Sequence, residues 1–430
     1  MKKLLTALLM ITAISGSLLA GGFQINDQSA RSVGMGFSTV ANINDPSSIF
    51  YNPAAMVDIP GDLAFSVGAC YIMPGAKFTG ITTLNQNNTT PAEAWNFLIP
   101  NVYAAWKTPM KGLSFGVGFF APFGLGSRWP NDWVGKYAAL ETYMQTLELN
   151  PNLAYNFDLA AMNVSVSAGF GYAMGNVEMK QLLSTFTPNP LLDLKGSGNG
   201  TTYNFGLNVG IMKNLKFGAS YRHNIEIEYS GDVTYENITG LEGMFQATTG
   251  KTKIKFPSDL RIGLALELMK DLWIEAGINS VGWSSYDTLK ITFDKMPGNP
   301  ATSYTKSTPR LYKDAMIYRI AGEYKYSDNL TLRLGCYYDP LAVDVDHIEP
   351  VLPEGNRIGV SFGIGYSINK MLSFDLGYLG IIGSQAEVNK LLEPGQPGYD
   401  PNKPMQDPSA MNGYYNTWAN VLALSLNVHL

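Results

Sequence analysis

The sequence contains little charge. Asp, Glu, Lys and Arg make up 15% of its 430 residues, against about a quarter in ordinary soluble domains. The net charge of -5 argues against nucleic acid as a partner, because neutralising phosphates requires a basic surface. Histidine and cysteine are also scarce, with three and two residues. The composition therefore does not point to an enzyme, a metal site or a bound cofactor.

The few reactive side chains are not arranged for catalysis. His223, His347 and His429 have no serine, cysteine or metal-ligating partner at an informative spacing. Cys70 and Cys336 lie far apart in strand-like stretches. They could form one disulfide in an oxidising compartment, although two unpaired small apolar side chains are the more usual arrangement. The pairing of the two cysteines therefore stays open.

A long apolar run that could cross a membrane as a helix is missing after residue 20. The best candidate, 159–177, holds 19 residues without a charge, but its apolar side chains alternate with small or polar ones. That period of two is typical of a strand. The alternating residues are Val164, Val166, Ala168, Phe170 and Tyr172, interleaved with Ser165, Ser167, Gly169 and Gly171.

Residues 1–20 have the composition of a cleaved secretory signal peptide. Two lysines at positions 2 and 3 precede an uncharged, largely apolar run, and Ala20 then stands before two glycines. The run is too short for a full membrane span of about 20 residues, and no basic stop-transfer cluster follows it. We therefore expect export, with cleavage near Ala20.

The same alternation recurs along the rest of the chain and predicts about 14 strands. Short links alternate with segments of roughly 15–30 residues, which is typical of the short periplasmic turns and long external loops of a membrane barrel. A soluble secreted β-protein would lack this alternation of loop lengths. We therefore predict an all-β fold, a transmembrane antiparallel β-barrel over 61–430. The expected strands are 62–75, 96–108, 112–122, 143–157, 162–178, 198–213, 214–232, 248–269, 271–284, 312–327, 329–341, 356–368, 370–384 and 416–430.

One segment, 21–60, does not have the pattern of a strand. It is rich in Asn, Ser, Gly and Asp, which favours contact with polar groups. It also holds scattered apolar residues, which favour a packed element over a disordered tail. A plug inside a polar barrel lumen satisfies both features. These apolar residues are Phe23, Ile25, Ile49, Phe50 and Tyr51.

At this segment the chain resembles the FadL/TodX family of outer-membrane transporters for long-chain fatty acids and other hydrophobic compounds. The opening GGFQINDQSA, with Phe23, is similar to the start of the family's N-terminal hatch, and 45–56 resembles the stretch that contains Asn52-Pro53-Ala54. More diffuse matches span nearly the whole chain. They include Tyr221-Arg222, Trp283-Ser284, Lys313-Asp314-Ala315 and Arg357.

The resemblance implies a 14-stranded barrel in the outer membrane of a Gram-negative bacterium, surrounded by outer-membrane lipid and plugged by the hatch. It implies insertion by the outer-membrane assembly machinery, and we expect a monomer. Substrate would be released sideways through a gap made by an inward kink of the third strand. Gly116, Gly118 and Pro122 lie there and suit a strand interruption, although glycines in a crowded lumen wall are an equal alternative.

The external segments carry apolar residues that suggest a capture surface. Leu182, Leu183 and Phe186 lie in one expected loop, and Leu241 and Phe245 in the next. Apolar residues on a water-exposed loop indicate a binding groove or packing of one loop on another. The family precedent places the first substrate contact between these two loops.

A fatty-acid carboxylate requires a cation near the pocket. Lys313 matches a family lysine implicated in head-group binding, but the arginine expected on the fifth strand is absent, with Met174 near that place. Lys313 could equally be a rim lysine paired with Asp314. Uptake of long-chain fatty acids is the function we predict, with neutral or aromatic hydrocarbons, or a general porin, as alternatives.

Overall fold

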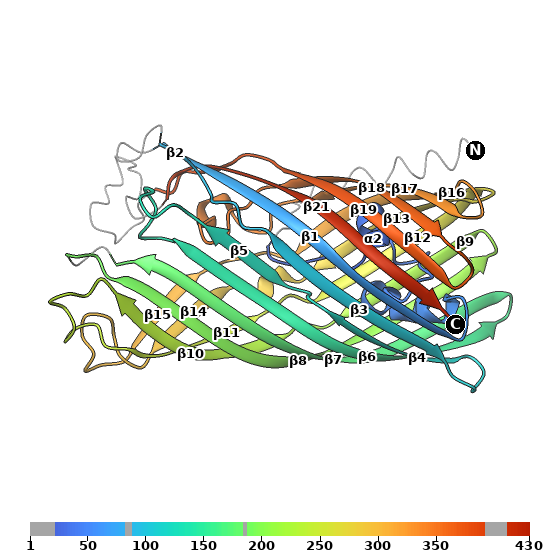
Figure 1. The fold of residues 1–430 in the computed structure, drawn as a ribbon, viewed down its shortest axis with the longest axis horizontal. Coiled ribbons are helices and arrows are strands. Elements are labelled where there is room, and N and C mark those ends of the chain that lie inside the picture. Colours follow the sequence, from blue (N-terminus) through green and yellow to red (C-terminus); the bar gives the residue numbers. More distant parts are fainter. Residues whose placement is uncertain (1–21, 82–87, 184–186, 392–410) are drawn as a thin grey trace.

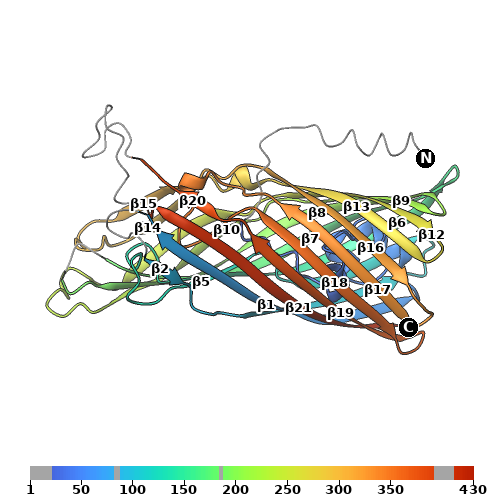
Figure 2. The same cartoon turned by 90° about the horizontal axis from the view of Figure 1, so that it is seen from above.

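The strands close into a single barrel. The computed structural model describes residues 22–81, 88–183, 187–391 and 411–430, so the expected signal peptide lies outside the described residues. The last strand, β21 (Gly413–His429), pairs antiparallel with the first, β1 (Leu63–Gly80), along its whole length (Figures 1 and 2). A sheet without free edges leaves no strand unpaired in lipid.

Fourteen strands cross the barrel wall, as predicted. Within the described residues, seven of them are interrupted and appear as two segments each. The segments after β1 are β2 (Thr89–Pro91), β3 (Phe97–Lys107), β4 (Leu113–Phe120), β5 (Gly124–Arg128), β6 (Glu141–Leu159), β7 (Met162–Leu182), β8 (Leu191–Met212), β9 (Leu215–Arg222), β10 (Glu226–Glu236), β11 (Thr248–Lys255), β12 (Asp259–Met269), β13 (Leu272–Val281), β14 (Thr288–Phe293), β15 (Tyr304–Pro309), β16 (Ala315–Lys325), β17 (Leu330–Asp339), β18 (Arg357–Ser367), β19 (Leu372–Gly383), β20 (Ala386–Val388) and β21.

The period of two separates a lipid-facing surface from a lumen. On β21, Leu422, Leu424 and Leu426 are 46%, 57% and 41% exposed, whereas the intervening Ser425 is 2% exposed. The exposed leucines form part of an apolar belt that suits the hydrocarbon of a bilayer. The alternating sequence pattern therefore corresponds to the two faces of the wall.

The two ends of the barrel differ in their connections. Short turns join the strands at the end near the C-terminus, and long connections gather at the opposite end (Figure 1). Gly112 lies in one of the short turns with a φ of +81°, which favours glycine. A Cβ at this position would lie 2.4 Å from the carbonyl oxygen of Asn156. The turn therefore requires glycine on both counts.

Residues 22–60 lie inside the barrel, and we call them the hatch segment. Figure 1 shows their short helices within the ring of strands. Almost all of these residues are buried. No helix in the described ranges is both long and apolar enough to span a membrane. The helices of the hatch segment are α2 (Ala30–Gly34), α3 (Ser48–Tyr51) and the 3-10 helix η2 (Pro53–Asp58); η3 (Trp283–Ser285) and η4 (Val345–His347) lie in connections.

Candidate substrate pocket and its hatch

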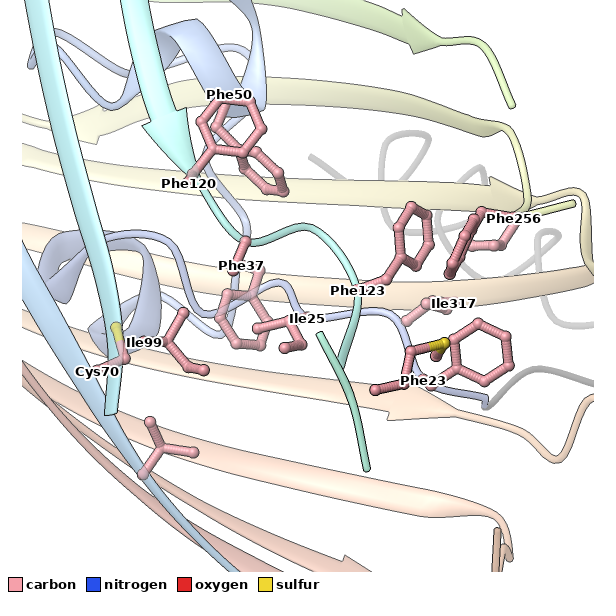
Figure 3. Close-up of a cluster of buried hydrophobic side chains, with 14 of the residues drawn as sticks. Phe23, Ile25, Phe37, Phe50, Cys70, Ile99, Phe120, Phe123, Phe256 and Ile317 are labelled. Atoms are coloured by element: carbon pink, nitrogen blue, oxygen red, sulfur yellow. The ribbon is translucent and has the colours of Figure 1, made fainter. Parts of the chain in front are cut away.

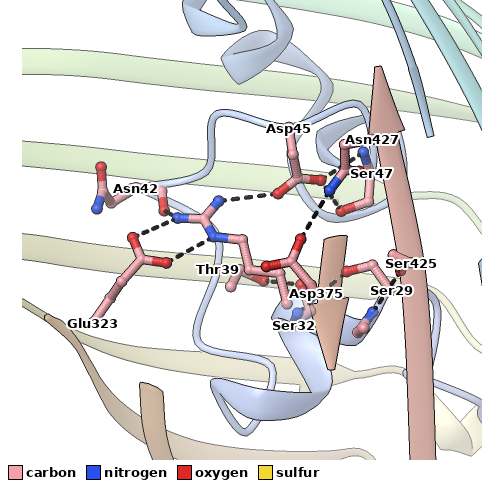
Figure 4. A network of polar contacts seen from close by, with 12 residues as sticks. Ser29, Ser32, Thr39, Asn42, Asp45, Ser47, Glu323, Asp375, Ser425 and Asn427 are labelled. Carbon is pink, nitrogen blue, oxygen red and sulfur yellow. Dashed lines mark hydrogen bonds and ion pairs between the residues drawn. The ribbon is translucent and has the colours of Figure 1, made fainter. Parts of the chain in front are cut away.

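An ionic network fixes the middle of the hatch segment to the wall. Arg31, on α2, pairs with Glu323 of β16 at 3.0 Å and with Asp45 of the hatch segment at 3.1 Å. Glu323 also pairs with Arg333 of β17 at 2.7 Å. Arg333 in turn pairs with Asp375 of β19 at 2.6 Å. Figure 4 shows this network spreading from the hatch segment to several strands. Buried charges remain ionised when they are paired and hydrogen-bonded in this way.

Glycines on three neighbouring strands allow α2 to approach the wall closely. A Cβ on Gly363 of β18 would lie 2.9 Å from the Cα of Gly34, and a Cβ on Gly335 of β17 would lie 2.3 Å from the backbone of Met35. Gly377 of β19 has a similar contact with Ala30. These inward-facing glycines therefore form the part of the wall against which α2 packs.

The Asn52-Pro53-Ala54 motif docks the end of the hatch segment. The Asn52 side chain accepts from the Ala54 N–H at 3.3 Å and donates to the carbonyl oxygens of Val40 and Leu207 at 2.8 and 3.0 Å. Proline fits the first turn of η2, where its missing N–H costs nothing. The motif therefore caps a helix and links two parts of the hatch segment to β8.

The third barrel strand is interrupted, but not at the glycines. β4 continues through Gly116 and Gly118 to Phe120, and the break follows before β5 begins at Gly124. A Cβ on Gly116 would lie 2.8 Å from the Ile49 side chain. These two glycines therefore make room for the hatch segment, and the kink consists of Ala121, Pro122 and Phe123.

The kink is hydrogen-bonded to the first residues of the hatch segment. The Gln28 side chain donates to the Ala121 carbonyl at 2.6 Å and accepts from its N–H at 3.4 Å. The Ile25 N–H donates to the Pro122 carbonyl at 2.9 Å, and the Gly124 N–H donates to the Phe23 carbonyl at 3.0 Å. Residues 22–28 and the broken wall strand thus form one connected unit.

A cavity of about 570 Å³ lies beside this unit. Its lining is mainly apolar and comes from 22–27, the wall segments 92–99 and 124–128, and parts of β1, β6 and β21. Phe23 lines it and packs edge-on against Trp283, Tyr286 and Phe256, with ring centroids 4.9, 5.3 and 5.8 Å away. Figure 3 shows Phe23, Phe123 and Phe256 gathered at one side of the buried cluster. Ligand pockets of about 300–1,000 Å³ with such lining are typical of small apolar molecules.

One part of the cavity is polar. Arg357 pairs with Asp339 at 2.9 Å, and Arg319 stacks on Tyr337, with its guanidinium carbon 5.6 Å from the ring centroid. Several buried polar atoms of the lining residues have no hydrogen-bond partner among the described residues. They are Asp27 Oδ1, Arg319 Nε, Asp339 Oδ1 and Arg357 Nε.

Two carboxyl groups next to this part titrate near neutral pH. Burial raises the pKa of Glu354 from 4.5 to about 7 and the pKa of Asp27 from 3.8 to about 6. Glu354 accepts from the Gly22 N–H at 2.6 Å. The start of the hatch segment is therefore held by a carboxyl group whose charge changes around neutral pH.

The structure brings only some of the expected site residues into the cavity. Phe23 lines it, whereas Lys313 is half-exposed elsewhere and pairs with Asp344 at 2.6 Å. Phe245 is buried against Tyr235, at 5.3 Å between ring centroids, which is packing within the external region. The remaining expected capture residues, Leu182, Leu183 and Leu241, also lie outside the cavity lining, and Phe186 lies outside the described residues.

Sequence reasoning did not find Arg319 and Arg357 as pocket residues. The structure concentrates many of the few charges in the lumen, in contact with the hatch segment. Inward-facing charged positions within the alternating strands were the available signal. Cys70 is buried, Cys336 is exposed, and both are free. No group of three or more potential metal-ligating side chains occurs in the described part of the chain.

Comparison with known proteins agrees with this architecture. The model of the outer membrane protein transport protein family (OMPP1/FadL/TodX) matches residues 11–429. A long-chain fatty acid transport protein of Escherichia coli O6:H1 is 26% identical over 420 residues, covering 85% of this chain and 88% of that protein.

Solved structures show the same fold. A Pseudomonas aeruginosa FadL homologue superposes with a TM-score of 0.77 at 18% identity, covering 95% of this chain and 99% of the other. The Pseudomonas putida toluene transporter TodX superposes with a TM-score of 0.73 at 17% identity and the same coverage. The chain is therefore a multi-strand β-barrel of the outer membrane, a transport channel and not an enzyme, and it belongs to the OMPP1/FadL/TodX family.

Proposed function

We propose that this protein takes up hydrophobic molecules with a small polar head, long-chain fatty acids foremost. Apolar residues at the external end of the barrel, Leu182, Leu183, Phe186 and Leu241, make the first contact, and the buried Phe245 packs beneath them. The substrate then enters the cavity beside Phe23, and movement of residues 22–28 releases it sideways through the wall.

The observation that carries this proposal is the link between cavity and wall. Phe23 lines the cavity, and its own carbonyl and the neighbouring Ile25 N–H are hydrogen-bonded to the kink of the third barrel strand. A ligand that displaces Phe23 must therefore break or shift the contacts that hold the kink. Cavity occupancy and wall opening are coupled by the same few residues.

The chemistry of the cavity favours an amphipathic substrate over a neutral hydrocarbon. Arg319 and Arg357 line the cavity, and their Nε atoms have no partner among the described residues. A carboxylate is a natural acceptor for arginine. The remaining lining binds an alkyl chain through burial of apolar surface. Lys313 is proposed as a contact for the head group outside the cavity, since it lies at an exposed position beside Asp344.

Uptake of labelled oleate and labelled toluene tests the proposal in a host that lacks its own long-chain fatty acid transporter. We expect oleate uptake that falls about tenfold in Phe23→Glu, since a buried carboxylate in the aromatic cluster is strongly unfavourable. The control is Phe115→Glu, at a lipid-facing position of β4 away from the cavity, judged by heat-modifiable mobility to be folded.

Each outcome decides between the alternatives. Toluene uptake without oleate uptake would move the substrate class to neutral aromatics. Oleate uptake that is unaffected by Phe23→Glu or by removal of 21–60 would remove the hatch from the mechanism. A large open conductance in planar bilayers would favour a general porin, because a plugged lumen conducts poorly.

A further inference from the structure

The barrel wall contains a window beside the cavity. β3 pairs with β4 only from Val102, opposite Phe119, onward. In the described residues, β5 has a pairing partner only in β6. The stretch 97–101 of β3 therefore has no strand opposite it on this side. The outer edge of the window is closed by a hydrogen bond from the Glu93 N–H to the Arg128 carbonyl at 2.8 Å.

Aromatic side chains fill this window where backbone pairing is missing. The Phe97 ring lies directly on Gly126 of β5, so that a Cβ there would be only 2.1 Å from Phe97 Cζ. Trp95 packs on Phe97 at 5.3 Å and stacks on Tyr143 of β6 at 5.6 Å between ring centroids. Phe97 and Tyr143 are nearly parallel, 26° apart. The three rings join the two sides of the window.

A charged residue of the cavity lining packs on the Trp95 ring of this stack. The guanidinium carbon of Arg128 lies 4.1 Å from the centre of the Trp95 ring, within the range of a cation–π contact. Arg128 also pairs with Glu141 at 3.0 Å. Trp95 is thus also held by Arg128, whereas the Phe97 side chain packs on the two other rings, on Gly126 and against the buried hydrophobic cluster.

The aromatic stack lies between the hatch side of the cavity and its lipid-facing side, where the exposed Leu98 and Trp418 also line it. Phe97, Trp95, Tyr143 and Gly126 all line the cavity that Phe23 lines from the hatch side. The next residue of β3, Leu98, is 65% exposed on the outer face. A molecule that moves from the hatch side of the cavity to the bilayer at this height therefore moves past these rings.

We propose that Phe97, supported by Trp95 and Tyr143, is a lateral gate in the barrel wall that selects substrates by their cross-section. The Phe97 side chain can rotate off Gly126 without breaking a hydrogen bond, because its backbone pairs with β1 on the opposite side. A slender alkyl chain needs only this rotation. A branched or fused-ring molecule needs the whole stack to separate, including the contact of Trp95 with Arg128.

This inference rests on the proposed function, because it concerns the exit of the same substrate. Its test compares uptake of oleate with uptake of phytanate, a fatty acid with the same head group and a methyl-branched chain. In Phe97→Ala, we expect the phytanate-to-oleate uptake ratio to rise about tenfold, at the low end of the discrimination that close apolar contacts provide. Tyr143→Ala should raise the ratio by a smaller factor.

The matched control is Phe115→Ala, the same change at a lipid-facing position of the neighbouring β4, where the ratio should not change. An unchanged phytanate-to-oleate uptake ratio in Phe97→Ala, with normal oleate uptake, would overturn the lateral gate and leave the proposed function standing. Absence of oleate and phytanate uptake by the unmodified protein would overturn the proposed function itself. If Phe97→Ala does not fold, Phe97→Leu retains an apolar side chain and should raise the ratio in the same direction.

Discussion

The hatch segment has two parts that are held by different forces. Its middle part, around α2, is tied to β16 through a buried ion pair, and that pair continues into a network on β17 and β19. Its first residues, 22–28, are held by single hydrogen bonds to the kink and by the Glu354 carboxyl. Most residues of both parts are buried, so the kind of contact distinguishes them more than burial does.

The difference lies in the free energy needed to move each part. Removing one partner of a buried ion pair costs about 3–5 kcal/mol, whereas a single hydrogen bond contributes about 1 kcal/mol net. The cavity is lined by 22–27 and not by α2 or its ion pairs, so an entering substrate contacts the second part and not the first. We therefore expect gating motion to be confined to the residues next to the cavity.

The largest effect is expected from Arg31→Ala. This change leaves Glu323 and Asp45 buried without their shared partner, and should destabilise docking of the middle part by about 3–5 kcal/mol. Hydrogen–deuterium exchange should then increase across α2 and η2. The control is Lys325→Ala, which removes an exposed ion pair with Asp328. Such a pair contributes about 0–1 kcal/mol to stability. Equal exchange in both variants would show that the network is not an anchor.

A smaller effect is expected from Gln28→Ala, which removes both side-chain contacts with Ala121. Two hydrogen bonds of about 1 kcal/mol each are lost, so amide exchange should rise at 121–124 and leave α2 protected. Exchange that rises in α2 as well would mean that the two parts of the hatch segment move together. Gln24→Ala, in the same stretch but bonded to Asp259 instead, is the control.

The smallest effect is a pH dependence of hatch opening. Burial is the largest cause of the raised pKa of Glu354, so opening that hydrates this carboxyl returns its pKa toward 4.5 and releases a proton. The closed state is therefore favoured below about pH 4.5 and loses that advantage as the pH rises to about 7. Ligand dissociation should accelerate across this range, by less than about tenfold per pH unit.

The variant Glu354→Gln should weaken this pH dependence, because the amide does not titrate. Asp27, with a pKa of about 6, also contributes, so the double variant with Asp27→Asn should weaken the pH dependence further. Arg357, Asp339 and Tyr312 also act on Glu354 and stay unchanged in these variants. A dissociation rate that falls as the pH rises would reverse the assigned sign.

The amino-acid sequence by itself determined the barrel. Its period of two, its alternating short and long connections and its polar segment before the first strand are local patterns, so each could be identified without knowing what lies opposite. The alternating pattern places glycines such as Gly363 and Gly377 on the inward face of their strands, but it does not show that α2 packs against them.

Only the tertiary structure decided the site. Alternation shows that a side chain points inward, but not at what height it lies or which distant strand faces it. For that reason Arg319 and Arg357 were missed and Lys313 was expected nearer the pocket. Of the three residues expected at the kink, Gly116 and Gly118 lie within β4, and only Pro122 lies in the break. The cavity and its window are assembled from residues hundreds of positions apart, and closure of the barrel alone brings them together.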